Sequence, residues 1–305
     1  MKKFSTQIAF IFLLFCSFNK SFSQLSDGGT PAGFKLANDN RLVAEIMPPF
    51  NIDSMFTDDS INQLYKDRPY RFGYNHLVNY NINNSGRIVT LANGDRIWQL
   101  DVKSSGALSI NLAFSNFHLP VGAKLFVYSK DHSQILGAFT SKNNLQDKYF
   151  GTELIYDDEV VVEYDEPATV AGQGTFTLFR ITHGYKSAYN IAKAFGDAGN
   201  CMNNVNCPQY SAWSNQKRAV VCLVSGGNEF CSGSLVNNTR NDGTPYILTA
   251  NHCGTADGTW VFRFNWEAPG CPNPSTNPSS QSISGGTPVA NRAGSDFDLC
   301  LMSSV

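Results

Sequence analysis

Short runs in which apolar and polar residues alternate recur along most of the chain. In the run at 96–102, Trp98, Leu100 and Val102 fall on one face of a strand, because successive side chains of a strand point to opposite faces. Asn93-Gly94 separates this run from the one at 87–91, and this pair of residues favours a type I′ turn. The pattern therefore predicts a β-hairpin.

Similar runs predict further strands on both sides of residue 190. The expected strands are 108–114, 124–128, 159–164 and 175–182 before it, and 218–224, 230–236, 246–250, 260–266 and 296–302 after it. Strands this short and this regularly spaced are typical of an all-β fold and, in the first part, of a β-sandwich. Residues 24–75 are less regular and are interpreted as a lead-in arm. The Pro-, Ser- and Gly-rich segment 269–286 is expected to be largely loop.

The first residues have the layout of a secretory signal peptide. Lys2 and Lys3 precede an apolar run at 8–15, and the small residues Ser21 and Ser23 favour cleavage after Ser23. The apolar run is too short for a membrane span, so no membrane partner is expected. We therefore expect a secreted protein from which residues 1–23 are removed.

Composition changes this picture in two ways. Hydrophobic residues make up 42% of the chain and charged residues 16%, which predicts packed cores, and a net charge of −2 without a basic stripe gives no support for nucleic-acid binding. Seven of the eight cysteines lie between 201 and 300, while 24–195 contains none. This shift predicts a domain boundary between residues 195 and 196. In an exported segment the cysteine density also predicts disulfides, and the odd number leaves one cysteine without a partner.

His252 is the candidate for chemistry, because it follows the expected strand 246–250 within Leu-Thr-Ala-Asn-His-Cys. A serine nucleophile at neutral pH needs a base, and the base needs a carboxylate to orient it. Asp296 and Asp298 are both candidate carboxylates, and alternation predicts that they share one strand face, so chemistry alone leaves the choice open. A zinc site of His252, Cys253 and other cysteines is disfavoured, because no C-x₂-C pair or HExxH spacing accompanies them.

Three segments together resemble the first half of a trypsin-type serine protease, and most closely the bacterial lysyl endopeptidase family. They are CSGSLVNNT (231–239), PYILTANHCG (245–254) and SDFDLCLM (295–302), and 98–129 resembles the precursor region ahead of such enzymes. The resemblance implies that His252 is the catalytic base and that Asp296, rather than Asp298, is its partner. It also implies the disulfides Cys231–Cys253 and Cys207–Cys271, and no cofactor.

The implied organisation is all-β, with a β-sandwich-like pro-region at 24–195 and the first barrel of a two-barrel protease at 196–305. The family nucleophile lies in a Gly-x-Ser-Gly turn, whereas only Ser303 and Ser304 follow 295–302 here. We therefore expect residues 1–305 to be the N-terminal part of a secreted serine endopeptidase precursor, inactive alone and acting on protein or peptide substrates when complete. Cleavage after lysine is implied as well, although the residues that select lysine would lie beyond Val305.

Two alternatives stay open at this point, and the sequence leaves the oligomeric state open too. The chain is either this precursor or an exported binding or adhesion protein whose sandwich carries the function and whose barrel is degenerate. Cys222 and Cys300 fall outside the implied pairs, and they either form an additional bridge or remain as buried thiols.

Overall fold

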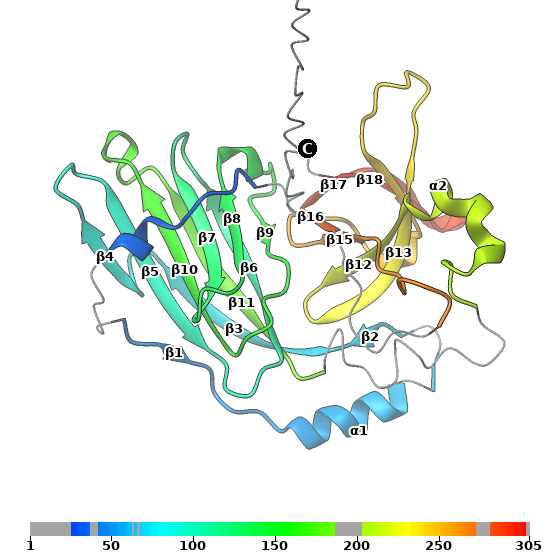
Figure 1. The fold of residues 1–305 in the computed structure, drawn as a ribbon, viewed down its shortest axis with the longest axis horizontal. Coiled ribbons are helices and arrows are strands. Elements are labelled where there is room, and N and C mark those ends of the chain that lie inside the picture. The colour runs from blue at the N-terminus through cyan, green and yellow to red at the C-terminus, as the bar shows by residue number, and fades with distance from the viewer. Residues whose placement is uncertain are drawn as a thin grey trace, which may run out of the picture.

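The computed structural model of the chain describes residues 26–36, 42–62, 64–65, 68–186, 203–272 and 281–302. These residues form a mostly β structure with three sheets (Figure 1). The expected signal peptide 1–23 and the expected boundary between 195 and 196 lie outside the described residues. No helix in the described part is long and apolar enough to cross a membrane.

Two sheets come from residues before 187, and we call them together the sandwich. One sheet has the order β1-β5-β10-β7-β8, with β4 also paired to β5, and the other has the order β3-β11-β6-β9. The strands are β1 (Glu45–Ile46), β3 (Gly73–Asn81), β4 (Arg87–Thr90), β5 (Arg96–Lys103), β6 (Ser109–His118), β7 (Lys124–Ser129), β8 (Ile135–Phe139), β9 (Phe150–Gly151), β10 (Glu159–Glu166) and β11 (Thr175–Gly184).

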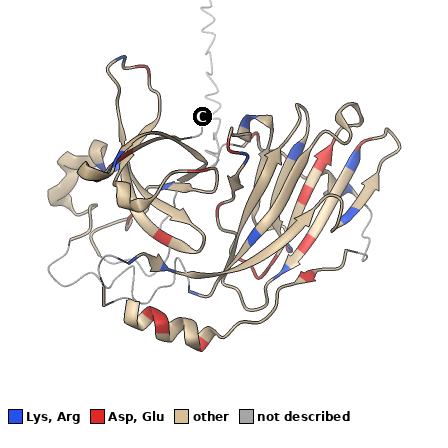
Figure 2. Cartoon of the chain, turned by 180° about the vertical axis from the view of Figure 1, so that it is seen from behind, with Lys and Arg blue, Asp and Glu red and all other residues tan. Residues whose placement is uncertain are grey.

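Alternation along the strands explains why the two sheets pack face to face. Trp98, Leu100 and Val102 of β5 share one face, as the sequence predicts, and they join Val162 of β10 and Leu178 of β11 in one buried cluster. Charged residues lie on the opposite face of the first sheet (Figure 2), and ion pairs link neighbouring strands there. In these pairs Lys103 and Lys130 both contact Glu159, at 2.7 and 3.1 Å.

The hairpin predicted around Asn93-Gly94 is present, but its turn is of another type. β4 pairs with β5 in antiparallel register, and the Gly94 N–H donates to the Leu91 carbonyl at 2.9 Å. Gly94 has φ 86°, whereas Asn93 is not among the residues with positive φ. A type I′ turn requires positive φ at both central residues. The loop is therefore a turn that ends in a left-handed glycine, and the type I′ prediction is wrong.

The third sheet, which we call the half-barrel, has the order β16-β15-β12-β13-β14-β18-β17 and curls around its own core (Figure 1). Its strands are β12 (Val220–Ser225), β13 (Asn228–Val236), β14 (Tyr246–Thr249), β15 (Val261–Phe264), β16 (Gln281–Ser284), β17 (Gly286–Arg292) and β18 (Phe297–Met302). Leu223, Ile247 and Phe262 are fully buried inside it. That this sheet is the first barrel of a trypsin-like protease stays a prediction.

Two segments are more regular than the sequence predicts. The expected loop 269–286 includes β16 and leads into β17. The expected arm 24–75 contains the helix α1 (Ile52–Asn62), the strand β2 (Tyr70–Arg71) and the start of β3. The remaining helices are α2 (Ser214–Lys217) and the 3₁₀ turns η1 (Ala32–Lys35), η2 (Ser141–Asn143), η3 (Ala168–Val170), η4 (Pro208–Trp213), η5 (Asn251–Cys253) and η6 (Ala293–Ser295).

The sandwich and the half-barrel are joined along a close backbone contact. β2 pairs with β13 and so adds a strand from the first part of the chain to the third sheet. The Phe72 and Gly73 N–H groups both donate to the Gly227 carbonyl, at 2.7 and 3.0 Å. A Cβ on Gly227 would meet the Gly73 carbonyl oxygen at 2.7 Å, so glycine permits this approach.

Side chains of both units fill the space beside this backbone contact. Phe72 and Leu154 of the sandwich pack with Val224 and Val261 of the half-barrel in a separate buried cluster. The outer face of β12 and β15 is therefore covered by the sandwich, while their inner face lines the half-barrel core.

Candidate active site

His252 is presented by a tight turn that follows a central strand. β14 pairs with β13 on one side and with β18 on the other, and it ends at Thr249. The chain then forms η5, and the next residue, Gly254, has φ 99°, a backbone angle that favours glycine. The imidazole consequently lies outside the sheet, at its surface, with 70% of the side chain exposed.

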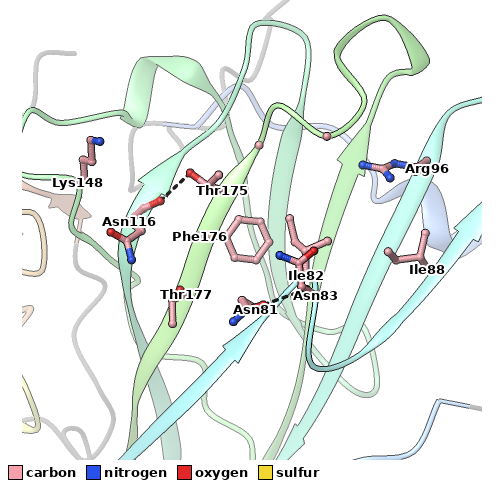
Figure 3. Close-up of a pocket in the computed structure, with 12 residues that line it drawn as sticks. Asn81, Ile82, Asn83, Ile88, Arg96, Asn116, Lys148, Thr175, Phe176 and Thr177 are labelled. Carbon is pink, nitrogen blue, oxygen red and sulfur yellow. Dashed lines mark hydrogen bonds between the residues drawn. The ribbon is translucent and has the colours of Figure 1, made fainter.

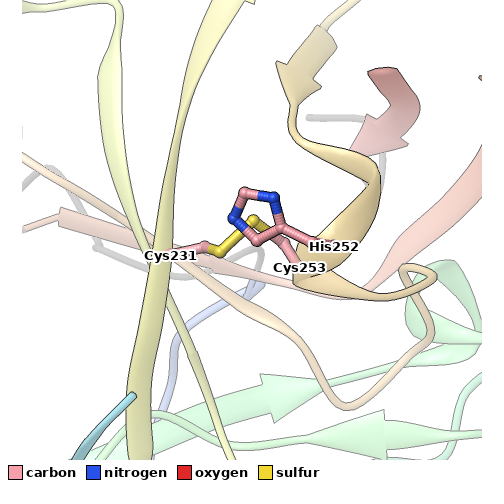
Figure 4. Close-up of side chains that lie close together, drawn as sticks. All are labelled: Cys231, His252 and Cys253. Carbon is pink, nitrogen blue, oxygen red and sulfur yellow. A yellow bond between two sulfur atoms is a disulfide. The ribbon is translucent and has the colours of Figure 1, made fainter. Parts of the chain in front are cut away.

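A disulfide fixes the backbone next to this histidine. Cys253 is bonded to Cys231 of β13, across 22 residues of sequence (Figure 4). The Thr249 hydroxyl donates to the Ser232 carbonyl at 2.8 Å and lies 3.5 Å from the Cys253 sulfur. Both ends of the turn are thus attached to β13, and such attachment restricts the movement of the ring between them.

Asp296 holds His252 with both of its carboxylate oxygens. The His252 backbone N–H donates to Oδ1 at 2.9 Å, and Nδ1 of the ring lies 2.6 Å from Oδ2. The hydrogen bond from the His252 backbone, followed by the one from its ring, lowers the pKa of Asp296, so this carboxyl group is ionised at neutral pH. An ionised carboxylate at Nδ1 favours the ring tautomer that carries its proton there.

This arrangement leaves Nε2 as the basic nitrogen of the ring. Within the described residues the His252 side chain bonds only to Asp296, so Nε2 has no protein partner there. Asp296 is 53% exposed, and the pair therefore lies on an open surface. Chemically, such a pair can accept a proton at Nε2 and stabilise the resulting imidazolium, as a general base requires.

Asp298 lies in a different environment, although alternation predicts that it shares a strand face with Asp296. β18 begins only at Phe297, and Asp296 has left-handed backbone angles, φ 48° and ψ 46°, so the alternation does not extend to it. Asp298 is 1% exposed and faces inward with Cys300, and burial raises the pKa of its carboxyl group. The prediction of a shared face is wrong, and the aspartate that meets His252 is Asp296.

The cluster Cys231, His252 and Cys253 has the residue types of a metal site, and its potential ligand atoms lie within 4.8 Å of one another. Figure 4 shows both sulfur atoms joined in the disulfide beside the imidazole ring. Metal binding by cysteine uses the thiolate, which a disulfide does not offer. As it stands the cluster therefore cannot hold zinc.

The other cysteines divide into a second disulfide and two free thiols. Cys207 is bonded to Cys271, which ties the segment before β12 to the one after β15. Cys222 and Cys300 are both free, and burial raises the pKa of each thiol to about 12. Of the two alternatives left open by the sequence, the structure shows free thiols, with Cys300 buried and Cys222 half-buried. Cys201 lies outside the described residues.

The sequence gives no indication that the sandwich contacts the loop that follows His252. The Gly258 N–H donates to the Asp147 carboxylate at 2.9 Å, and the Gly151 N–H donates to the Gly258 carbonyl at 2.9 Å. A Cβ on Gly151 would meet the Thr259 carbonyl oxygen at 2.6 Å, so the two backbones touch. The contact lies six residues after the candidate base.

A buried ion cluster joins the two units near this contact, and the sequence does not reveal it either. Arg263 of β15 is fully buried, and its guanidinium meets Glu153 of the sandwich at 2.8 Å and Glu229 of β13 at 3.0 Å. Burial is the largest single influence on Glu153 and raises its pKa, but the charge of Arg263 and the hydrogen bonds to the carboxylate together lower the pKa. An arginine within a predicted strand is the only trace of this cluster in the sequence.

One known protein family is similar to the part of the chain that contains these residues. A family model described as the lysyl endopeptidase, C-terminal domain, matches residues 195–305. The matched part contains the half-barrel with His252, Asp296 and both disulfides. This part of the chain is thus similar to a lysyl endopeptidase domain.

Proposed function

We propose that residues 203–302 carry the histidine and aspartate of a serine endopeptidase. The observation that carries the proposal is the double contact of Asp296 with the His252 backbone and ring, which orients the ring and directs Nε2 outward. The similarity of residues 195–305 to a lysyl endopeptidase domain supports the same reaction class.

In this mechanism His252 removes the proton from a serine hydroxyl as the oxygen attacks the carbonyl carbon of the peptide bond. Nε2 carries that proton while the tetrahedral intermediate exists, and it then delivers the proton to the leaving amine. Asp296 stays ionised throughout, keeps the proton on Nδ1 and stabilises the charged ring. The serine and the groups that select the substrate side chain come, in this proposal, from outside the described residues, and lysine is the preference we infer from the resemblance.

The sandwich is, in the same proposal, the pro-region of this precursor. Its contacts with Gly258 and Arg263 support a role in holding the half-barrel and the loop after His252 during folding. Export through residues 1–23 is part of the proposal and explains the use of disulfides.

The test is peptidase activity of the protein expressed from its complete reading frame, with peptides that carry lysine, arginine or leucine before the scissile bond. We expect cleavage after lysine, a loss of about 10⁴-fold in kcat for Asp296→Asn, and a larger loss for His252→Ala. His118→Ala, which changes an exposed histidine of the sandwich, is the matched control and should retain full activity. A protein that cleaves none of the peptides, or a His252→Ala variant that remains active, would contradict the proposal.

A second measurement tests the pair directly in residues 1–305 and does not depend on peptide hydrolysis. Nitrogen-15 NMR of the His252 ring at neutral pH should give the tautomer with its proton on Nδ1, and Asp296→Asn should change that population. If the ring spectrum of Asp296→Asn were unchanged, the carboxylate would not be what sets the tautomer of the ring.

A further inference from the structure

A second candidate site lies in the sandwich and shares no residue with the half-barrel. It is a cavity of about 600 Å³ at one edge of the sandwich. The end of β3, the loop between β3 and β4, and the start of β11 contribute to its lining. Figure 3 shows Asn116 and Lys148 on one side of Phe176, and Ile88 and Arg96 on the other. A hollow of this size accommodates a ligand of a few sugar or amino-acid units.

Two backbone irregularities shape one wall of this cavity. β6 has an extra residue opposite β11, because Thr175 pairs with His118 while Thr177 pairs with Ser115. Such a bulge re-aims the side chains at its position, and bulges are frequent beside functional sites. Here Asn116, one of the residues at the bulge, lines the cavity (Figure 3).

Asn116 and the neighbouring Lys148 both adopt left-handed backbone angles, with φ 50° and 57°. The Phe117 N–H donates to the Lys148 carbonyl at 2.9 Å, so the bulge and the turn that carries Lys148 support each other. A left-handed conformation is uncommon for residues other than glycine, and it concentrates at functional sites. Asp296 of the candidate dyad shares this conformation.

The polar groups that line the cavity are largely unused. Among the described residues, the amides of Asn83 and Asn116, the ammonium group of Lys148 and the hydroxyl of Thr177 have no hydrogen-bond or ion-pair partner. The Arg96 guanidinium is different, because it is paired with Glu166 through Nε at 2.7 Å. The free groups therefore comprise two amides that both donate and accept, a hydroxyl and one unpaired positive charge.

Apolar side chains complete the lining. Phe176 is buried at its base, while Ile82 and Ile88 lie along one side, and Ile88 is 43% exposed. A ligand that fits must therefore offer hydroxyl groups to the amides, a carboxylate to Lys148 and C–H faces to the isoleucines. A sugar ring with a carboxylate substituent has all three, whereas an extended peptide lacks the row of hydroxyls.

We propose that this cavity binds an acidic oligosaccharide, with Lys148 contacting a uronic-acid carboxylate and Asn83 and Asn116 contacting ring hydroxyls. The site would give the sandwich a binding function that is independent of peptide hydrolysis, because none of its residues belongs to the half-barrel. Attachment to an acidic polysaccharide would keep the protein near that material.

The experiment is calorimetric titration of the protein with trisaccharides of galacturonic, glucuronic and guluronic acid, and with the corresponding neutral trisaccharides. At least one acidic trisaccharide should bind with a Kd below about 1 mM, about tenfold more tightly than its neutral counterpart. Lys148→Gln should abolish that difference, and Asn116→Gly, which tolerates the left-handed backbone, should weaken both by about tenfold. Lys142→Gln is the matched control, because Lys142 pairs with Asp27 outside the cavity.

Three results would overturn the proposal. The first is the absence of binding by every acidic trisaccharide up to about 10 mM. The second is equal affinity for acidic and neutral sugars, and the third is binding that both cavity variants leave unchanged. Thermal melting of each variant verifies its folding, and where a variant does not fold, amide NMR shifts of the unaltered protein decide: shifts at Asn83, Asn116 and Lys148 support the site, and shifts elsewhere refute it.

Discussion

The sandwich and the half-barrel bury the apolar faces of their β-sheets in different ways. The sandwich presses two sheets against each other, so each sheet covers the other, and residues 24–195 contain no cysteine. The half-barrel is a single curled sheet with a smaller apolar cluster and two disulfides, and the sandwich covers its outer face at β12 and β15. A single curled sheet buries only its inner face. In this chain two disulfides and the contact with the sandwich add to the stability of such a sheet.

Arg263 shows most clearly that the half-barrel depends on its contact with the sandwich. It lies on the outer face of the half-barrel, is fully buried, and has one of its two carboxylate partners in the sandwich. A buried charge is tolerated only while its partners are in place, and removal of one partner is usually costly. Arg263 of the half-barrel is therefore fully paired only while the sandwich is in contact with it.

Among the substitutions that separate the two units, Glu153→Ala should cause the largest loss of stability. It leaves the guanidinium of Arg263 buried with half of its charge partners, so we expect a loss of about 3–5 kcal/mol, concentrated in the half-barrel. Hydrogen exchange followed by mass spectrometry measures the protection of each unit separately. Loss of protection in the sandwich alone would contradict the dependence that we describe.

The matched control for that prediction is the double substitution of Glu153→Met with Arg263→Met. Replacing buried ionic groups by apolar groups of similar volume is often close to neutral, so the double variant should be more stable than Glu153→Ala. A double variant that is equally unstable would show that packing, rather than charge, dominates at this position.

Removal of the Cys207–Cys271 disulfide should have the next largest effect. The closed loop is long, with a sequence separation of 64, and chain entropy predicts a loss of about 4 kcal/mol for Cys207→Ser with Cys271→Ser. Urea unfolding measures the loss, and hydrogen exchange assigns it to one unit. We expect the sandwich to keep its protection, and equal loss in both units would mean that they unfold as one.

A smaller, pH-dependent effect is expected in the sandwich from His183. Burial, and secondarily the neighbouring His76, lower the pKa of His183 from 6.5 to about 4. The unfolded chain therefore binds this proton near pH 6.5 and the folded chain only near pH 4, so stability is complete above pH 6.5 and falls as the pH drops toward 4. The shift corresponds to at most about 3 kcal/mol.

Thermal melting between pH 7 and 4 tests this prediction. His183→Gln can still form a hydrogen bond with Ser104, whose hydroxyl oxygen lies 2.8 Å from Nδ1 of the ring, but glutamine does not titrate in this range. Its melting temperature should therefore fall less steeply than that of the unaltered protein. Parallel slopes would exclude His183 as a source of acid sensitivity.

Asp296→Asn should have the smallest effect on stability. The pair with His252 is exposed to solvent, and water and salt screen such pairs, so they contribute little to stability. Urea unfolding of the variant should thus resemble that of the unaltered protein, although the same change should nearly abolish turnover. A large loss of stability would identify the pair as structural instead.

Much of the strand content could be predicted, because alternation is a local property. The strands from β4 to β7, and also β10 and β11, follow from it, and the apolar face of Trp98, Leu100 and Val102 is buried as expected. β16 and β17 were missed, because their residues are polar or follow prolines and form strands only by pairing with β15 and β18. α1 was missed as well, because its apolar residues show little helical periodicity.

The sequence by itself determined which residues could do chemistry, since His252, the two aspartates Asp296 and Asp298, and the cysteines stand out by residue type, and only the family resemblance favoured Asp296. It could not separate Asp296 from Asp298 by alternation, because a left-handed residue at the start of β18 interrupts the pattern. Only the tertiary structure brought Asp147, Gly151 and Glu153 against the half-barrel, and only it gathered Asn116 and Lys148 around one cavity. Those contacts join residues far apart in the chain, and long-range backbone approach leaves no local signal in one sequence.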